Sequence, residues 1–289
     1  MGKKAITVLL ADGSPSGLIQ CKIGNWNGVA YKIPRIEVDK YKDHEHLKQT
    51  GVYFLFGKSE DEVDDLVYIG QAKERKNGEG LLYRLQEHIR NPDKYYWNEA
   101  VVFTNNDNSL GPTEICYLEH KFCTIAKNTK RYIVKNGNDP NPGNVKEEEE
   151  CVLEEFIEYA KLIMVILGHK VFVPKSEKIS DTEEQLFYVG KKSDKENKAT
   201  GKCTSEGFLL LAGSYINPDI SDSLIPSYKN LRDRYASLIQ NNNILKEDIL
   251  FTSPSGASSF ALGRTSDGRT DWKTESGKSL KEIEDEKAK

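Results

Sequence analysis

The sequence has few of the features that mark a secreted or membrane protein. It has five cysteines, an odd number, and none of them forms a Cys-x-x-Cys arrangement. We therefore expect free thiols in a reducing cytoplasm rather than disulfides or a cysteine-ligated zinc site. The most apolar window, residues 160–174, contains two lysines and a histidine and is too short to span a bilayer. The first residues also lack the apolar segment of a signal peptide, so we expect a cytoplasmic protein with no membrane partner.

An excess of basic residues is also absent. The 289 residues include 41 lysines and arginines against 45 aspartates and glutamates, which gives a net charge of −4. Proteins that bind nucleic acid through bulk charge have the opposite balance. Any contact with nucleic acid must therefore come from a local patch. The length predicts roughly two domains of ordinary size.

Hydrophobic spacing and turn residues predict an α+β protein, because short alternating strands are mixed with helices of period 3.6. We expect five parts in chain order: a β-rich N-terminal segment (1–50), a compact α/β unit (51–146), a long connecting helix (147–173), a polar linker (174–205) and a small C-terminal α+β domain (206–289).

The compact unit has the clearest pattern. We expect strands near 52–56, 66–69 and 99–104, and helices near 79–90 and 112–127. Pro112 suits a first helical turn, where its missing N–H would lack a partner in any case. In the C-terminal domain, we expect a strand at 207–214, a helix at 226–242 and a small hairpin around the Asp267-Gly268 turn.

Two tyrosines flank an acidic loop, in the tripeptides Gly51-Val52-Tyr53 and Tyr68-Ile69-Gly70. Because side chains alternate along a strand, a hairpin places Tyr53 and Tyr68 on one face as cross-strand neighbours. A tyrosine pair beside core aliphatic residues is structural more often than catalytic. This pattern alone therefore favours core packing.

Two helices add charged side chains beside their apolar faces. Arg84 and His88 are four residues apart, so both project from one edge of a leucine stripe. They suit either a capped helix edge or the lining of a cleft. Glu119 falls within the apolar arc of the second helix, where a carboxylate is costly unless it is paired or binds a metal. A buried salt bridge, for example to Arg84, is the structural alternative.

Together these side chains suit the hydrolysis of a phosphodiester. This reaction needs a hard cation on the phosphate, which one or two carboxylates can hold while several waters are retained. It also needs positive charge for the transition state and a base for the attacking water. Glu119 could hold the cation and Arg84 could supply the charge. Tyr53 or His88 could orient or deprotonate the water.

The same residues, in the same order, resemble the GIY-YIG nuclease family. The similarity rests on the two tyrosine tripeptides, the Arg84 helix, the Glu119 helix and a following loop that contains asparagine. The resemblance implies an α/β sandwich, in which a three-stranded antiparallel sheet is flanked by helices. It also implies an endonuclease that cleaves DNA with one Mg²⁺ or Mn²⁺ ion bound by Glu119.

The resemblance also implies roles for individual residues. Tyr53 would be the general base or would position the water, and Tyr68 would contact phosphate or water. Lys73 would contact phosphate, and the loop asparagine would be Asn136 or, as the second choice, Asn138. The implied catalytic set is Tyr53, Tyr68, Arg84, His88 and Glu119.

The remainder resembles a bacterial subgroup with a C-terminal domain of unknown function of the DUF4357 type. The run from Ser253 to Lys273 carries this similarity. On the expected hairpin, three cations and a tryptophan would cluster and could position a DNA substrate, although the hairpin could also be purely structural. These residues are Arg264, Arg269, Trp272 and Lys273.

Two features oppose tight DNA binding by residues 51–146 alone. This unit has 13 basic and 14 acidic residues, and the loop between the tyrosine tripeptides is acidic. We expect that loop, which contains Glu60, Asp61, Glu62, Asp64 and Asp65, to point away from DNA because it would repel the phosphates. The alternative function is a catalytically inactive module that retains the fold and binds nucleic acid or protein.

Overall fold

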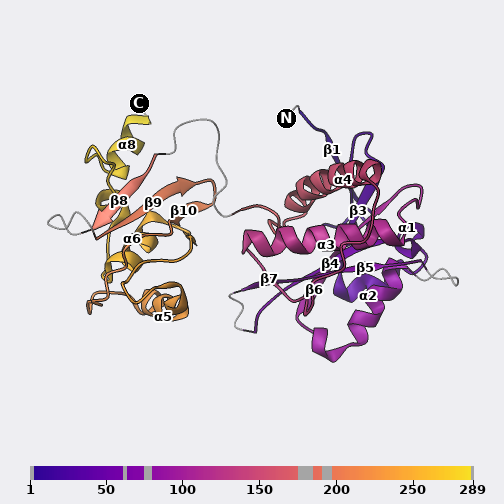
Figure 1. Ribbon diagram of the computed structural model, residues 1–289, viewed down its shortest axis with the longest axis horizontal. Helices are drawn as coiled ribbons and strands as arrows, with labels where there is room; N and C mark the ends of the chain where they lie inside the picture. Colours follow the sequence, from indigo (N-terminus) through magenta and orange to yellow (C-terminus); the bar gives the residue numbers. More distant parts are fainter. Residues whose placement is uncertain (1–2, 61–63, 75–79, 175–184, 191–196, 288–289) are drawn as a thin grey trace. The chain divides into compact units, whose positions relative to one another are not determined.

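The computed structural model describes residues 3–60, 64–74, 80–174, 185–190 and 197–287 (Figure 1). The chain divides into two compact units, Met1–Pro174 and Lys175–Lys289. Within the described residues, the first unit contains a seven-stranded sheet and the second a four-stranded sheet, and helices pack on both. The α+β fold class is therefore confirmed. A search of the described helices finds none with the length and apolar character needed to cross a membrane.

The sheet of the first unit has the order β1-β2-β3-β6-β4-β5-β7. Its strands are β1 (Ile6–Leu10), β2 (Ile19–Ile23), β3 (Gly28–Pro34), β4 (Gly51–Lys58), β5 (Asp65–Ala72), β6 (Trp97–Asn105) and β7 (Ile133–Val134). Adjacent strands are antiparallel, except that β7 runs parallel to β5.

The N-terminal segment is part of this sheet rather than a separate part of the chain. Strand β3 pairs with β6 along its whole length, from Gly28 opposite Asn105 to Pro34 opposite Glu99. The three strands expected at 52–56, 66–69 and 99–104 are present as β4, β5 and β6. The expectation of a three-stranded sheet is nevertheless wrong, because β1, β2 and β3 extend the sheet on one side and β7 extends it on the other.

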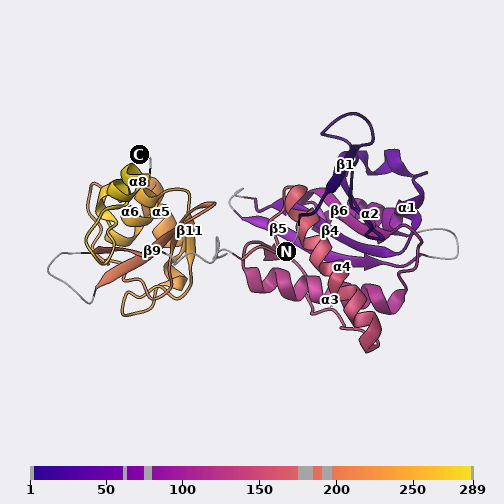
Figure 2. The ribbon, with the colours of Figure 1, turned by 90° about the horizontal axis from the view of Figure 1, so that it is seen from above.

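Helices cover both faces of this sheet (Figures 1 and 2). In chain order they are η1 (Arg35–Tyr41), α1 (Glu45–Lys48), α2 (Leu81–Arg90), η2 (Pro92–Lys94), α3 (Pro112–Thr129) and α4 (Glu147–Ile166). The helices expected at 79–90 and 112–127 correspond to α2 and α3. The long connecting helix ends earlier than expected, at Ile166, and Gly168 follows with a φ of +98°.

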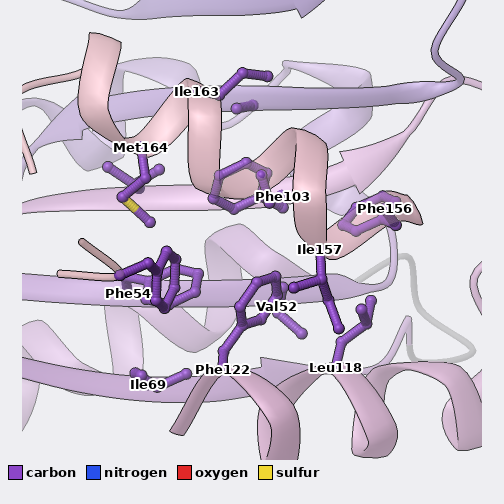
Figure 3. Close-up of a cluster of buried hydrophobic side chains, with 14 of the residues drawn as sticks. Val52, Phe54, Ile69, Phe103, Leu118, Phe122, Phe156, Ile157, Ile163 and Met164 are labelled. Carbon is purple, nitrogen blue, oxygen red and sulfur yellow. The ribbon is translucent and has the colours of Figure 1, made fainter. Parts of the chain in front are cut away.

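Side-chain alternation along β4 decides which helix each residue meets. Val52 and Phe54 point to the face covered by α3 and α4, where they join Phe122 and Phe156 in one buried cluster (Figure 3). Tyr53 points the other way, into the cluster beneath α2. Burial of each large apolar side chain contributes about 1.5–3 kcal/mol. The two cores therefore fix Tyr53 on the α2 face of the sheet.

The second unit starts within the segment expected to be a linker. Its strands are β8 (Phe187–Gly190), β9 (Lys198–Thr204), β10 (Gly207–Leu210) and β11 (Ile249–Phe251), in the order β11-β10-β9-β8. Its helices are α5 (Pro226–Arg234), η3 (Ala236–Leu238), α6 (Pro254–Leu262), α7 (Gly268–Asp271) and α8 (Leu280–Lys287). Strands β8 and β9 lie inside residues 174–205, so this domain starts earlier than the expected residue 206.

The expected hairpin around Asp267 and Gly268 is wrong. Asp267 instead caps α7, because its side chain accepts a hydrogen bond from the backbone N–H of Arg269 at 3.1 Å. Trp272 is fully buried and its Nε1 donates to the carbonyl of Pro254 at 2.9 Å. An Asp-Gly pair favours a tight hairpin turn. Here the burial of the tryptophan against α6 holds the chain in a helical turn.

Candidate active site

Tyr53 and Tyr68 lie on the same face of the sheet, as expected, but they are diagonal rather than directly opposite neighbours. Tyr53 is opposite Gly70, and Tyr68 is opposite Leu55. The two tyrosine ring centroids are 6.2 Å apart. A Cβ atom on Gly70 would lie 2.3 Å from the hydroxyl oxygen of Tyr53. Gly70 therefore leaves the space that the Tyr53 side chain occupies.

The Tyr53 hydroxyl is hydrogen-bonded to His88 of α2. The distance from Oη to Nε2 is 2.7 Å, and the two residues are 1% and 3% exposed. Burial, assisted by the charges of Lys94 and Arg84, lowers the pKa of His88 to about 3. Burial also raises the pKa of Tyr53. At neutral pH both groups are uncharged, so the phenol donates its hydrogen to Nε2.

We expect this pair to make the fold sensitive to acid. Between pH 6.5 and about pH 3, the unfolded chain binds a proton at His88 that the folded protein does not. The free energy of unfolding should therefore fall with decreasing pH in this window, by up to about 1.4 kcal/mol per pH unit from this residue. Urea unfolding at pH 7, 6 and 5 measures the slope. His88→Gln should give a shallower slope than the wild type, and equal slopes would contradict the assignment.

Two cations stand beside the tyrosines. Arg84 forms an ion pair with Glu87 at 2.5 Å, and its side chain remains 40% exposed. Its positive charge acts to lower the pKa values of Tyr53 and Tyr68. The Nζ atom of Lys94 lies 3.3 Å from the centroid of the Tyr68 ring, a cation–π contact. Burial and the charge of Arg84 lower the pKa of Lys94 to about 8.

Lys94 is a member of this cluster that sequence reasoning missed. It lies in η2, one short turn after α2, and no spacing rule connects it with Tyr68. Only the path of the chain over the end of the sheet brings the two together. A lysine that follows a helix with candidate residues was the only available signal, and it is a weak one.

Glu119 approaches the cluster from the other face of the sheet. It projects from α3, and its Oε2 accepts a hydrogen bond from Nε2 of Gln71 at 2.8 Å. Gln71 belongs to β5, beyond the two residues that pair with β7. Glu119 therefore lies beside a part of β5 that, among the described strands, has no partner on that edge.

The charge on Glu119 is not neutralised within the described part of the chain. The salt bridge considered for Glu119 is absent there, because the guanidinium of Arg84 pairs with Glu87 instead. Burial raises the pKa of Glu119, while the Gln71 hydrogen bond and the charge of Arg84 oppose this shift. The negative charge of Glu119 in turn acts to raise the pKa values of Tyr53 and Tyr68. The carboxylate, the guanidinium and both phenols thus share one electrostatic environment.

A cavity of about 480 Å³ opens beside Arg84 and is lined in part by Gln71 and Lys73, whereas Tyr53, Tyr68, His88 and Glu119 are not among its lining residues. Lys73 is exposed at the margin of this cavity. Part of the acidic loop, Asp61 and Glu62, lies outside the described residues. At the end of that loop, Asp65 forms an ion pair with Lys58 at 3.3 Å.

Asn136 has a structural role in this arrangement. Its Nδ2 donates to the carbonyl of Ile69 at 2.7 Å, and its Oδ1 accepts from the N–H of the same residue at 3.1 Å. The N–H of Lys135 donates to the carbonyl of Val67 at 2.8 Å. Asn136 thereby continues the pairing of β7 with β5, next to Tyr68. Each end of its amide makes one hydrogen bond to the backbone of Ile69, which gives Asn136 a structural role here.

We expect Asn136→Ala to destabilise the protein by about 1–3 kcal/mol, because the two backbone groups of Ile69 lose their partner. Asn138→Ala is the matched control: Asn138 is exposed in the same loop and its loss should change stability by less than about 0.5 kcal/mol. Urea unfolding followed by circular dichroism compares the variants. Equal stability of the two would contradict the structural role of Asn136.

Glu119 is the only carboxylate in the candidate set. Among the described residues there is no group of three or more histidine, cysteine, aspartate or glutamate side chains suited to a metal ion. That excludes, within this part of the chain, a cage built from protein ligands. Mg²⁺ requires no such cage, because it keeps several waters and often binds through one or two carboxylates together with substrate phosphates. A half-buried carboxylate without an ion pair among the described residues fits this mode of binding.

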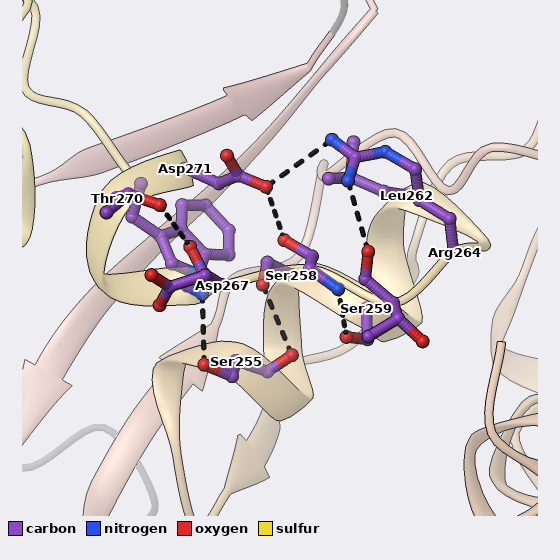
Figure 4. Close-up of polar contacts among 12 residues, drawn as sticks. Ser255, Ser258, Ser259, Leu262, Arg264, Asp267, Thr270 and Asp271 are labelled. Carbon is purple, nitrogen blue, oxygen red and sulfur yellow. Dashed lines mark hydrogen bonds and ion pairs between the residues drawn. The ribbon is translucent and has the colours of Figure 1, made fainter. Parts of the chain in front are cut away.

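The cations expected to cluster near the C-terminus are separated by ion pairs of their own. Arg264 pairs with Asp271 at 3.4 Å, and Arg269 pairs with Glu284 at 2.7 Å. Figure 4 shows the first of these contacts among the hydrogen bonds that tie α7 to α6. The backbone of Lys273 bridges to Tyr188 of β8. The two arginines are thus each paired with a carboxylate of the second unit, and the backbone of Lys273 joins this region to β8.

Comparison with known families finds a match within the second unit. Residues 189–284 match a family described as "Domain of unknown function (DUF4357)". The similarity expected from the run between Ser253 and Lys273 is therefore confirmed, and the DUF4357 domain begins in β8 rather than at residue 206. No curated protein and no solved structure matches the chain. The DUF4357 match carries no activity, so function has to be argued from the cluster in the first unit.

Proposed function

We propose that the first unit is a metal-dependent endonuclease that hydrolyses phosphodiester bonds of DNA. The observation that carries this proposal is the meeting of Tyr53, Arg84 and Glu119, which come from β4, α2 and α3 and influence one another's pKa values. These residues occupy the positions implied by the resemblance to GIY-YIG nucleases. The proposal therefore rests on an ordered sequence motif and on a geometry that brings its members together.

Glu119 would hold one Mg²⁺ or Mn²⁺ ion, which when bound supplies positive charge to the scissile phosphate. Gln71 fixes the orientation of the carboxylate through its 2.8 Å hydrogen bond. Arg84, with its side chain partly exposed, and Lys94 supply further positive charge, which stabilises the negative charge that develops on the phosphate oxygens. Lys73, at the margin of the adjoining cavity, would contact the DNA backbone.

The Tyr53–His88 pair explains how a tyrosine with a raised pKa can act as a base. His88 is neutral, and its Nε2 accepts the hydrogen bond from Tyr53. As the attacking water transfers a proton to the phenol oxygen, the phenol would transfer its own proton to Nε2. Tyr53 thus remains neutral before and after the step, and no isolated phenolate is buried. The positive charge then lies on His88, where burial and the charges of Lys94 and Arg84 oppose it, so the negative charge developing on the phosphate would have to offset this cost. Tyr68, beside both groups, would orient the water or a phosphate oxygen.

Nicking of supercoiled plasmid tests the proposal. The full-length protein should convert supercoiled DNA to the open-circular form with Mg²⁺ or Mn²⁺ and not with EDTA, and Glu119→Gln should lose this activity. Glu114→Gln is the matched control, because Glu114 lies in the first turn of the same helix, where its carboxylate folds over Gly111. Absence of metal-dependent nicking by the wild type, or equal nicking by Glu119→Gln, would favour an inactive binding module instead.

A further inference from the structure

A second, larger cavity lies elsewhere in the first unit. It has a volume of about 930 Å³ and is formed by N-terminal residues 3–5, the turn between β2 and β3, the residues after β6 and the first half of α4. It shares no lining residue with the cavity beside Arg84. None of the residues assigned to DNA cleavage lines it.

Aromatic rings form one wall of this cavity. The Trp26 ring lies 4.9 Å from Phe156 and 5.6 Å from Tyr159, measured between ring centroids. The indole ring of Trp26 packs directly against Gly28, where an added Cβ atom would lie 2.0 Å from the ring. Gly28 therefore leaves the space that the indole occupies. The ammonium of Lys4 already lies 4.3 Å from the centroid of Tyr159. The wall therefore accepts a cation against an aromatic face.

One polar group of the cavity lining, the side-chain carbonyl of Asn105, lacks a hydrogen-bond donor among the described residues. Asn105 is 5% exposed and lines the cavity, and its Nδ2 donates to Ser109 at 2.7 Å. Its Oδ1 is buried and has no hydrogen-bond partner in the described part of the chain. A buried carbonyl without a donor costs about 1–3 kcal/mol. Because Oδ1 is itself buried, a ligand donor would recover this loss once the amide turns toward the cavity.

The charge of the lining is negative. Four glutamates line the cavity, Glu114, Glu148, Glu149 and Glu155, against two lysines, so the formal balance is 2 − 4 = −2. This balance opposes a phosphate or carboxylate ligand and favours a cation.

We propose that this cavity binds a cationic hydrogen-bond donor, namely a guanidinium or primary ammonium group. The aromatic wall, the unpartnered carbonyl of Asn105 and the glutamates each select the same chemistry, and they do so through different interactions. Such a group could come from a free amine or guanidine, or from an arginine or lysine side chain of a peptide. The site is independent of the proposed nuclease activity.

Tryptophan fluorescence of the full-length protein provides the readout. Trp97 and Trp272 are 1% and 0% exposed, whereas Trp26 is partly buried and lines the cavity. The probes are n-butylguanidinium, its uncharged isostere n-butylurea, and a short peptide with one arginine between glycines. We expect the guanidinium or the peptide to bind at least ten-fold more tightly than the urea. Comparable affinity of n-butylguanidinium and the peptide would indicate that the free cation suffices, and a much tighter peptide would indicate a protein partner.

Three variants decide the role of charge. Lys4→Ala removes the competing ammonium and should tighten cation binding several-fold. Glu155→Gln should weaken it several-fold, whereas Glu158→Gln, on the same helix but outside the lining, should leave it unchanged. Equal binding of the guanidinium and the urea, no binding of either cationic probe, or weaker binding by Lys4→Ala would overturn the proposal. Melting temperatures of the variants confirm that each is folded.

Discussion

Tyr53→Phe should reduce the rate of DNA cleavage by about 10²–10⁴-fold, the usual contribution of a positioned acid–base group. The substitution removes one oxygen atom and keeps the ring that fills the space above Gly70. The reaction would lose the phenol that passes a proton from water to His88. Because His88 is 3% exposed, its Nε2 would also lose its hydrogen-bond partner, so we expect a parallel loss of stability of about 1–3 kcal/mol.

Tyr31→Phe is the matched control for this prediction. Tyr31 lies on the same face of the sheet as Tyr53, since each is opposite Val102 of β6 in register. It is equally buried, and its hydroxyl is hydrogen-bonded to His46. Tyr31→Phe should therefore lower stability by a similar amount and leave the cleavage rate unchanged. Single-turnover cleavage with saturating Mg²⁺ and urea unfolding measure the two effects separately. Equal rates for Tyr53→Phe and Tyr31→Phe would exclude Tyr53 from the chemistry.

The parts of the first unit that could be predicted from sequence depend on local periodicity. Alternation along β4 places Tyr53 on the face opposite Val52 and Phe54, and the structure has it there. Helical spacing places Arg84 and His88 on one edge of α2. These relations involve neighbours within one element, where geometry is fixed by the backbone.

The parts that could not be predicted depend on contacts between distant segments. The pairing of β3 with β6 joins residues about 70 positions apart, and no local pattern encodes it. The same is true of the hydrogen bond between Gln71 and Glu119, and of Lys94 over Tyr68. Asn136, expected to contact substrate, forms hydrogen bonds to the backbone of Ile69 that give it a structural role. Residue type alone cannot distinguish an amide that binds substrate from one that extends a sheet.

The turn at Asp267 shows how packing can override a local preference. Its Asp-Gly pair predicts a hairpin, and burial of Trp272 against α6 produces a helical turn instead. The cations expected on that hairpin then fall beside separate acidic partners. The preference of an Asp-Gly pair for a hairpin turn is worth about 1 kcal/mol, which is small compared with the free energy gained by burying a tryptophan side chain. The larger free energy of tryptophan burial therefore decides the conformation at this turn.

Gly70→Ala should have the second large effect, because it disturbs Tyr53 without altering any side chain proposed to act in the reaction. The added Cβ atom would lie 2.3 Å from Oη and 2.4 Å from Cζ of Tyr53. Since Tyr53 is 1% exposed, its ring has no free space into which it can move. Overpacking of this kind costs about 1–3 kcal/mol. Displacement of the hydroxyl from His88 should also bring the cleavage rate close to that of Tyr53→Phe.

Gly137→Ala is the control for the backbone effect of replacing glycine, because a Cβ atom there would have no neighbour within 4 Å. It should be neutral or stabilise by up to about 1 kcal/mol. A double-mutant cycle with Tyr53→Ala then isolates the contact. Once the Tyr53 ring is removed, the Cβ atom added by Gly70→Ala no longer clashes with it, so the destabilisation by Gly70→Ala should largely disappear. The effects of the two substitutions on the free energy of unfolding should therefore be non-additive by at least about 1 kcal/mol. Additive effects would mean that Gly70 is required for a reason other than the space occupied by Tyr53.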